Sequence, residues 1–468
     1  AQTPSAWYST DMLFDTTVYD LNGNRYTLSD LKIDTVTLNA DGLRTQLIAS
    51  ATCTNTYFNL YYEPGCGMAS ATNTIEIARR NVIEQLFCDL SAFITNQGGF
   101  SNKVNIWIRN PNTVIPSASS SGISAGATAF YTYPYNTAKS GIIDNEIWKT
   151  INSGQDSYIG ITSPLISTGS FYHGQITFNF ANTSFNWHDN LSTVPTSTVL
   201  DIYTLGLHEM MHSMGFTTGI YHNGNSKITN NSGISSNYYT RYDQFLKTQA
   251  GTSLITNSLS CSMYQYNFNS SLTPSVVLSP SPAACGSVIP SFGYLNSTTC
   301  SVSVLYSSPS VTVNVYTPDC YEFVSSLSHF EDMCYPSNNP SNNDQYFVMC
   351  SGNSNGMMKR YLKEEERKVL CDIGYSVAAT YGTPTYTTTQ KTYTAGSCNG
   401  LGVVGINDGL GTGGIYTYTT NVNTGTGTIQ PLTNDVGVSG GSYECLEVVV
   451  GVGTLTNTSG NLSTPFTY

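Results

Sequence analysis

Two histidines four positions apart, His208 and His212, are the residues of this chain whose type and spacing point most directly to chemistry. On an α-helix, positions i and i+4 lie on one face about one turn apart, so both imidazoles can reach a single metal ion. Glu209 follows the first histidine, where its carboxylate can take a proton from a metal-bound water. The pattern predicts a metal-assisted hydrolytic site. The alternative is a buried structural helix, which would leave the Glu209 carboxylate in apolar surroundings without a role.

The elements around this motif are those that a metal site on a helix requires. Residues 198–207 are largely apolar and predict a buried helix that runs into the motif. Gly215, three residues after His212, can end that helix in a left-handed conformation. An earlier amphipathic helix is expected after Asn73, which can cap it with Glu76 three residues on. Its apolar face would consist of Ile75, Ala78, Val82, Leu86, Leu90 and Phe93.

Several short segments alternate between apolar and polar residues and predict strands. Residues 104–108 and 175–180 show this pattern, whereas residues 111–141 are rich in Ser, Gly and Ala and predict a loop or flap. Residues 1–72 read as strands and loops that belong either to the catalytic unit or to a pro-segment. With the helices, these segments indicate an α+β fold.

Two histidines do not complete a catalytic metal site, because a third protein ligand is needed. The four remaining histidines are His173, His188, His222 and His329. Acidic candidates are Asp243, Glu322 and Glu331. His222 lies in a polar, loop-like stretch, and His173 precedes an expected strand, where a structural role fits better. The residues alone leave the third ligand open.

The segment from His208 to Phe216 resembles the leishmanolysin branch of the metzincin zinc peptidases, and in particular its secreted bacterial members. In that branch the helix-ending glycine is kept, and a long insertion separates the motif from the third histidine. The position six residues beyond His212, where simpler metzincins carry that ligand, holds Thr218 here. The likeness covers roughly residues 73–378.

The resemblance implies a role for several further residues. The segment 326–331 is similar to the family's third-ligand segment, which implies His329 as the third ligand of a Zn²⁺ ion. Met349 resembles the methionine of the turn beneath the metal, with Met357 and Met358 as competing candidates. Residues 362–375 resemble the closing helix of the domain. Glu209 would act as the general base.

We therefore expect a metzincin-like zinc peptidase domain over residues 73–378, with a disulfide-braced subdomain inserted at 217–328. β-like runs occur in that insertion at 301–305 and 311–315. Residues 379–393 are rich in Thr and Tyr and predict a linker. Residues 394–468 contain no Lys or Arg, alternate in Gly, Thr and Val, and predict a small all-β, immunoglobulin-like domain. That domain would either bind a surface or act as a spacer.

Composition narrows the partners and the compartment. A formal charge of −12 over 468 residues disfavours a nucleic-acid partner. No run of about 18 apolar residues occurs, so no transmembrane segment is expected. The opening residues, Ala1 to Pro4, are what a mature secreted protein or a trimmed chain would show.

The cysteines point to an extracellular protein. There are twelve, and none stands in a CxxC pair, so disulfides are expected rather than a cysteine zinc site. We expect three local pairings: Cys53 with Cys66, Cys334 with Cys350, and Cys398 with Cys445.

Together these features predict a secreted, monomeric zinc endopeptidase that acts on protein or peptide substrates. One alternative is a zinc peptidase of another branch, with Asp243 or Glu331 as the third ligand. Another is an inactive, peptidase-like secreted binding protein, against which the presence of Glu209 argues.

Overall fold

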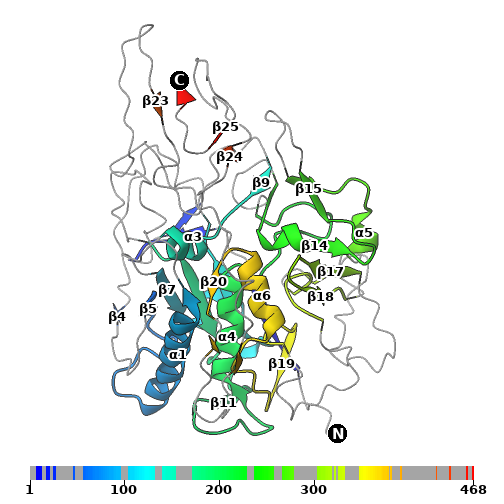
Figure 1. Cartoon of the computed structure of the whole chain (residues 1–468). Coiled ribbons are helices and arrows are strands. Elements are labelled where there is room, and N and C mark those ends of the chain that lie inside the picture. Colours follow the sequence, from blue (N-terminus) through cyan, green and yellow to red (C-terminus); the bar gives the residue numbers. More distant parts are fainter. Residues whose placement is uncertain are drawn as a thin grey trace.

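The structure, a computed structural model, describes residues 56–95, 104–131, 140–153, 171–228, 237–257, 266–278, 303–318, 325–331 and 347–378 continuously, with shorter pieces elsewhere. Helices and sheets together form a mixed α+β structure (Figure 1). The α+β class predicted from the sequence is therefore confirmed.

The main sheet has seven strands in the order β19-β1-β8-β10-β7-β5-β4. Their bounds are β19 Gly352–Ser354, β1 Trp7–Met12, β8 Ile123–Ala129, β10 Gly174–Phe178, β7 Val104–Arg109, β5 Phe58–Tyr62 and β4 Gln46–Leu47. Strands β5, β7 and β10 run parallel, and β8 is antiparallel to β10. Every residue of β7 and β10 is buried, as expected for central strands covered on both faces.

The N-terminal region contributes directly to this sheet. Strands β1, β4 and β5 all come from residues 1–72. Strands β1 and β5 pair with later strands of the sheet, and β4 pairs with β5 at its edge. Strand β1 is parallel to β8 and antiparallel to β19, so it joins the edge of the central strands to a segment more than 300 residues later. A hairpin of β2 (Thr17–Tyr19) and β3 (Arg25–Thr27) follows, and the ring of Tyr19 packs edge-on against Trp107 at 5.2 Å.

Two long helices lie side by side against the sheet: α1 (Thr74–Phe93) and α4 (Ile202–Ser213) (Figure 1). The predicted cap of α1 is confirmed, since the Asn73 side chain accepts from the backbone N–H groups of Ile75 and Glu76. The predicted apolar face is buried from Val82 onward. Ile75, in the first turn of α1, is the exception on this face and is 56% exposed.

The prediction of a loop or flap over 111–141 is wrong for its central part. This stretch contains α2 (Pro111–Val114), a short 3₁₀ helix at Ala118–Ser120, and β8, an inner strand of the sheet. Helix α4 packs directly on β8, and Ala125 and Ala127 are fully buried beneath it. Small residues permit that close approach, and they give the strand a loop-like composition.

The insertion at 217–328 carries several small elements in its described parts. A three-stranded sheet has the order β14-β17-β18, with bounds Leu246–Thr248, Val304–Ser307 and Thr312–Asn314. Strands β15 (Ile255–Asn257) and β16 (Tyr266–Phe268) form a hairpin, and a short helix α5 spans Pro274–Val277. Strand β13 (Tyr238–Tyr239) pairs with β9 (Gly141–Ile142), which ties the insertion to the preceding half of the domain. The four cysteines of the insertion lie outside the described residues.

Two further helices complete the described domain. Helix α3 (Glu146–Ser153) follows β9, and α6 (Glu364–Asp372) lies where the sequence predicts a closing helix (Figure 1). After α6, β20 (Ser376–Val377) pairs with β6 (Ile94–Thr95) at the end of α1. Strands β11 (Trp187–His188) and β12 (Leu200–Asp201) pair just before α4.

Beyond residue 379 the structure describes only short strand pairs. Strand β21 (Thr380–Tyr381) pairs with β22 (Lys391–Thr392) inside the predicted linker. Strand β23 (Thr428–Ile429) pairs with β26 (Phe466–Thr467), and β24 (Ser442–Tyr443) with β25 (Gly460–Asn461). The immunoglobulin-like arrangement predicted for 394–468 and the Cys398–Cys445 pairing lie outside the described residues.

The described cysteines correct two of the pairings expected from sequence distance. Cys66 is a free, buried thiol, and burial raises its pKa to about 12. Cys350 is also a buried thiol, which donates to the Gly352 carbonyl and accepts from Lys359 Nζ. The pairings of Cys66 with Cys53 and of Cys350 with Cys334 are therefore wrong. Cys88 and Cys371 are disulfide-bonded.

Candidate metal centre

Helix α4 carries the motif and has well-defined ends. Asp201 caps its start by accepting from the Thr204 N–H at 3.1 Å, and the buried Arg360 guanidinium forms an ion pair with the same carboxylate. The helix therefore begins at Ile202 and not at residue 198 as predicted, because Leu200 and Asp201 form strand β12. Gly215, with φ of +106°, ends the helix as predicted, and a Cβ there would stand 2.7 Å from Asn145 Nδ2.

Three histidines from two distant segments meet at one point. The Nε2 atoms of His208 and His212 are 3.1 Å apart, and His329 Nε2 lies 3.1 Å from that of His212 and 3.2 Å from that of His208. All three side chains are completely buried. Among the described residues, they are the one group of histidine, cysteine and acidic side chains placed to hold a metal ion.

Each of the three rings is held by a backbone carbonyl on its other nitrogen. The Nδ1 atom of His208 lies 2.6 Å from the Val348 carbonyl, that of His212 lies 2.8 Å from Phe216, and that of His329 lies 2.8 Å from Ser325. A carbonyl oxygen can only accept, so each Nδ1 must carry the proton. In the neutral ring, each Nε2 then presents an unshared lone pair to the other two.

The burial of the cluster keeps these rings neutral. Desolvation lowers the pKa of His212 to about 4, and it lowers those of His208 and His329 well below their usual range, with a further lowering from the neighbouring rings. Neutral rings with Nδ1–H cannot hydrogen-bond to one another through Nε2, so the contacts of 3.1–3.2 Å bring lone pairs together. A cation at their centre would turn this repulsion into three bonds.

The donor set and its spacing fit a zinc ion. Tetrahedral zinc with Zn–N bonds of about 2.0–2.1 Å places its nitrogen ligands about 3.3–3.4 Å apart. The three Nε2 atoms are 3.1–3.2 Å apart. Outer hydrogen bonds that orient the ring and fix its tautomer, such as those to the three carbonyls, are usual for metal-bound histidines.

Glu209 and Met349 both lie in the elements that build this centre. Glu209 is completely buried on α4, next to His208 in sequence. Met349 is completely buried in a turn, and its carbonyl accepts from Phe330 N–H at 2.7 Å. The turn residue before it, Val348, supplies the carbonyl that holds the His208 ring. This turn therefore contacts both segments that carry metal-site histidines.

Asp243 has a different task from metal binding. Its buried carboxylate accepts from Thr218 Oγ1 at 2.5 Å, from Gly219 N–H at 2.8 Å and from Thr240 N–H at 2.7 Å. It thus braces the chain just beyond α4 against the 3₁₀ helix at Tyr242–Phe245. Desolvation raises its pKa, and these hydrogen bonds oppose the rise. Asp243 does not belong to the metal-binding group.

The other candidates also lie apart from that group. Glu331 is buried but is not part of it, and Glu322 accepts from the Tyr316 hydroxyl at 3.3 Å. His173 Nδ1 accepts from the Asn105 N–H between neighbouring strands, which is the structural role expected for it. His188 Nε2 lies 3.0 Å from the Thr193 carbonyl. The His222 ring lies against that of Tyr221, with centroids 4.1 Å apart and planes tilted by 57°.

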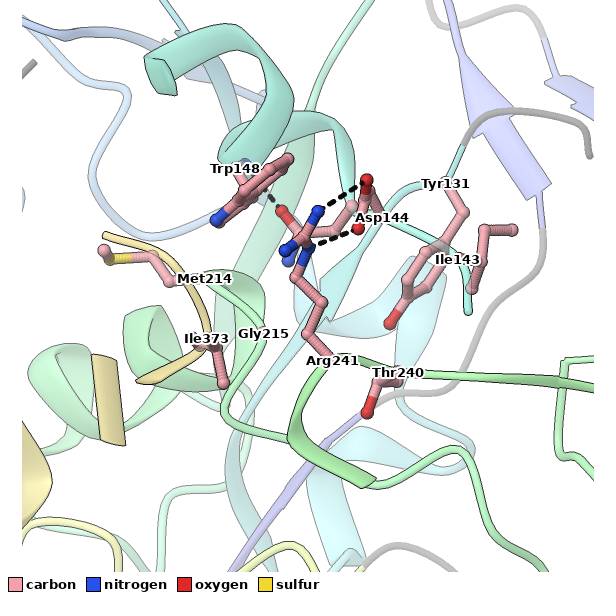
Figure 2. Close-up of a pocket in the computed structure, with 10 residues that line it drawn as sticks. Tyr131, Ile143, Asp144, Trp148, Met214, Gly215, Thr240, Arg241 and Ile373 are labelled. Carbon is pink, nitrogen blue, oxygen red and sulfur yellow. Dashed lines mark hydrogen bonds and ion pairs between the residues drawn. The ribbon is translucent and has the colours of Figure 1, made fainter. Parts of the chain in front are cut away.

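A small cavity lies at the end of α4, where Met214 and Gly215 form one wall (Figure 2). It has a volume of about 10 Å³, and no histidine of the cluster lines it. Arg241 donates to both carboxylate oxygens of Asp144, at 2.5 and 3.2 Å, and its guanidinium stacks 3.7 Å above the Trp148 ring. These contacts tie α3 to the insertion beside the helix end.

Sequence reasoning missed two buried lysines and a buried glutamate around the centre. Lys227 and Lys359 are each 2% exposed, and their charges lower the pKa values of cluster histidines. Burial lowers the pKa of Lys227 to about 7. Glu366, on α6, accepts from the Met349 N–H at 2.8 Å. Their positions in the sequence show no regular spacing from the motif, because only the folded chain brings them close to it.

No helix in the described part of the chain is long and apolar enough to cross a membrane. Comparisons of the chain with protein-family models, with curated proteins and with solved structures find no match.

Proposed function

We propose that this protein is a secreted zinc-dependent endopeptidase, similar to the leishmanolysin branch of the metzincins. The observation that carries the proposal is the convergence of three neutral Nε2 atoms within 3.2 Å, each from a ring whose Nδ1 is held by a backbone carbonyl. Three histidines with an open fourth position are a common ligand set of catalytic zinc.

The chain's own residues have distinct tasks in this proposal. His208, His212 and His329 would hold Zn²⁺, and their neutrality leaves the full charge of the ion in place. When bound, zinc lowers the pKa of a water molecule and polarises a carbonyl group. Glu209 takes a proton from the attacking water and passes it to the leaving amine. Glu209 is completely buried on the helix that carries His208 and His212, next in sequence to the first of them.

Met349 has a supporting role as the methionine of the turn below the metal. Its neighbour Val348 holds the His208 ring, and its own carbonyl pairs with the residue after His329. A rigid turn at this place keeps ligands from two distant segments in register. Met357 and Met358 are buried as well, but they follow β19 and are farther along the chain from Val348.

The two alternative functions require different residues at the site. A zinc peptidase with an acidic third ligand needs Asp243 or Glu331 beside His208 and His212, whereas His329 occupies that place among the described residues. An inactive binding protein does not need Glu209. The cysteine content and the disulfide-bonded Cys88 and Cys371 support a secreted protein.

Zinc analysis combined with cleavage of a denatured protein tests the proposal. The purified protein should hold one zinc per chain and cleave denatured casein, and removal of zinc by a chelator should abolish cleavage. Re-addition of zinc should restore it. A protein that holds zinc but cleaves neither casein nor short peptides would instead be a binding protein on a peptidase scaffold.

A further inference from the structure

A single peptide group links the His208 ring to a buried carboxylate. The Val348 carbonyl accepts from His208 Nδ1–H at 2.6 Å, and the N–H of the same peptide group, that of Met349, donates to Glu366 Oε1 at 2.8 Å. The order is therefore imidazole, peptide group, carboxylate. Because C=O and N–H point in opposite directions in a trans peptide, the two hydrogen bonds continue one another.

The Glu366 carboxylate, at the end of this series of hydrogen bonds, is held firmly in place. Glu366 is 1% exposed, and its other oxygen accepts from the Lys363 N–H at 2.7 Å, at the start of α6. One oxygen thus closes the first turn of the helix, and the other holds the peptide group beside the metal-site histidine. The hydrogen bond from Lys363 N–H is an ordinary helix cap and explains why a glutamate suits the first turn of α6. The hydrogen bond from Met349 N–H is not needed for capping.

The other two histidines provide an internal comparison. The peptide group that accepts from His212 donates through Thr217 N–H to the Gly215 carbonyl, and the one that accepts from His329 donates through Ser326 N–H to the Glu322 carbonyl. Both of these relays end on a neutral backbone oxygen. The relay with a carboxylate also has the shortest imidazole contact, 2.6 Å against 2.8 Å for each of the others.

We propose that Glu366 is a positioning residue of the metal centre, which acts on His208 through the Val348–Met349 peptide group. A carboxylate that accepts from the N–H polarises the amide, makes its carbonyl oxygen more negative and strengthens the hydrogen bond from His208 Nδ1–H. A stronger bond at Nδ1 fixes the tautomer and makes Nε2 a better ligand, as a directly bonded carboxylate does at many zinc sites. The expected consequence, tighter zinc binding, rests on the proposed function.

The relay can be measured directly because the chain has only six histidines. Histidine-selective ¹⁵N labelling should resolve the Nδ1–H protons of the three cluster rings by NMR. At about pH 9, where the Glu366 carboxyl is ionised because its pKa is about 7, the His208 Nδ1–H signal of Glu366→Gln should lie upfield of its wild-type position, which indicates a weaker hydrogen bond. The His212 and His329 signals should stay in place. Glu364→Gln, an exposed change in the same turn of α6, should move none of them. A purely structural glutamate would shift either all three signals or none, and either result would overturn the proposal.

Zinc affinity provides the second readout. Competition with a chelator should show binding weakened on the order of 10–100-fold in Glu366→Gln, the range typical for outer hydrogen-bond partners of metal ligands, and unchanged in Glu364→Gln. Equal affinity of the two variants would contradict the inference. If Glu366→Gln does not fold, Glu366→Asp tests the same point, since its shorter carboxylate cannot reach both N–H groups. The NMR shift is also expected in zinc-free protein. If the wild type binds no zinc, the proposed function fails, and that shift still decides whether the relay exists.

Discussion

The Nε2 atoms of His212 and His329 lie 3.1 Å apart although 117 residues separate them in the chain. A turn around Met349 connects helix α4 with the segment that carries His329. The Val348 carbonyl contacts the His208 ring, and the Met349 carbonyl accepts from the Phe330 N–H. Closing so long a loop carries an entropic cost, and the elements of the insertion offset part of it by packing among themselves and against β9. These contacts help to bring His329 to the two histidines of α4.

Replacing Glu209 by glutamine should separate metal binding from catalysis. The side chain keeps its size, so zinc content should stay at that of the wild type, while cleavage of a short peptide should slow by about 10²–10⁴-fold or more, because the proton acceptor is lost. Paired zinc analysis and peptide kinetics on both proteins check this. Near-normal turnover in the variant would show that another group takes the proton.

Asp243→Asn should affect stability and leave zinc content unchanged. The asparagine amide cannot accept at both positions where the carboxylate now accepts from Thr218, Gly219 and Thr240. We expect a loss of about 1–3 kcal/mol in the free energy of unfolding, the usual cost of a buried polar group left without a partner. Urea unfolding and zinc analysis measure the two effects. Loss of zinc from a folded variant would favour Asp243 as a ligand and contradict the site described above.

The raised pKa of Glu366 should make the stability of the protein depend on pH. Burial raises its pKa from 4.5 to about 7, so between these values the unfolded chain releases a proton that the folded chain retains. The contribution of Glu366 is therefore complete below about pH 4.5 and is lost as pH rises to about 7. Relative to Glu366→Gln, the zinc-free wild type should lose about 3 kcal/mol over that range, at 1.36 kcal/mol per pKa unit. Urea unfolding of both proteins at several pH values checks the sign; a difference that is flat or grows with pH would exclude the raised pKa.

The cysteines should divide into two classes on alkylation. In protein unfolded without reductant, Cys66 and Cys350 should react with iodoacetamide, whereas Cys88 and Cys371 should react only after reduction. Peptide mass mapping distinguishes the two sets. The pairing of Cys398 with Cys445 remains a prediction that the same map would test. Alkylation of Cys88 before reduction would contradict its disulfide.

Local signals in the sequence were sufficient for parts of the fold that are determined locally. The Asn73 cap of α1, the strand β7 and the helix-ending role of Gly215 follow from residue types within one or two turns. The start of α4 and the strand β8 did not follow, since both depend on packing. Helix α4 starts at Ile202 because Leu200 and Asp201 pair with β11 and Asp201 caps the helix. Ala125 and Ala127 form a strand beneath α4, although their composition predicts a loop.

The same division holds for the site. His208, Glu209 and His212 are set by one helix and are readable from spacing. His329 came from a family resemblance, because no local pattern distinguishes it from the other histidines. Glu366 was missed, since it contacts the site through the backbone of Met349 and leaves no signal in the spacing of side chains.

The most direct test of the account is an anomalous diffraction measurement on crystals of the zinc-loaded protein, with data collected above and below the zinc absorption edge. We expect one strong peak present only above the edge, about 2.0–2.1 Å from the Nε2 atoms of His208, His212 and His329. In His329→Ala the peak should be lost or strongly weakened, whereas in His222→Ala it should remain. A peak bonded to Asp243 or Glu331 in place of His329, or no peak at the three histidines, would contradict the central claim.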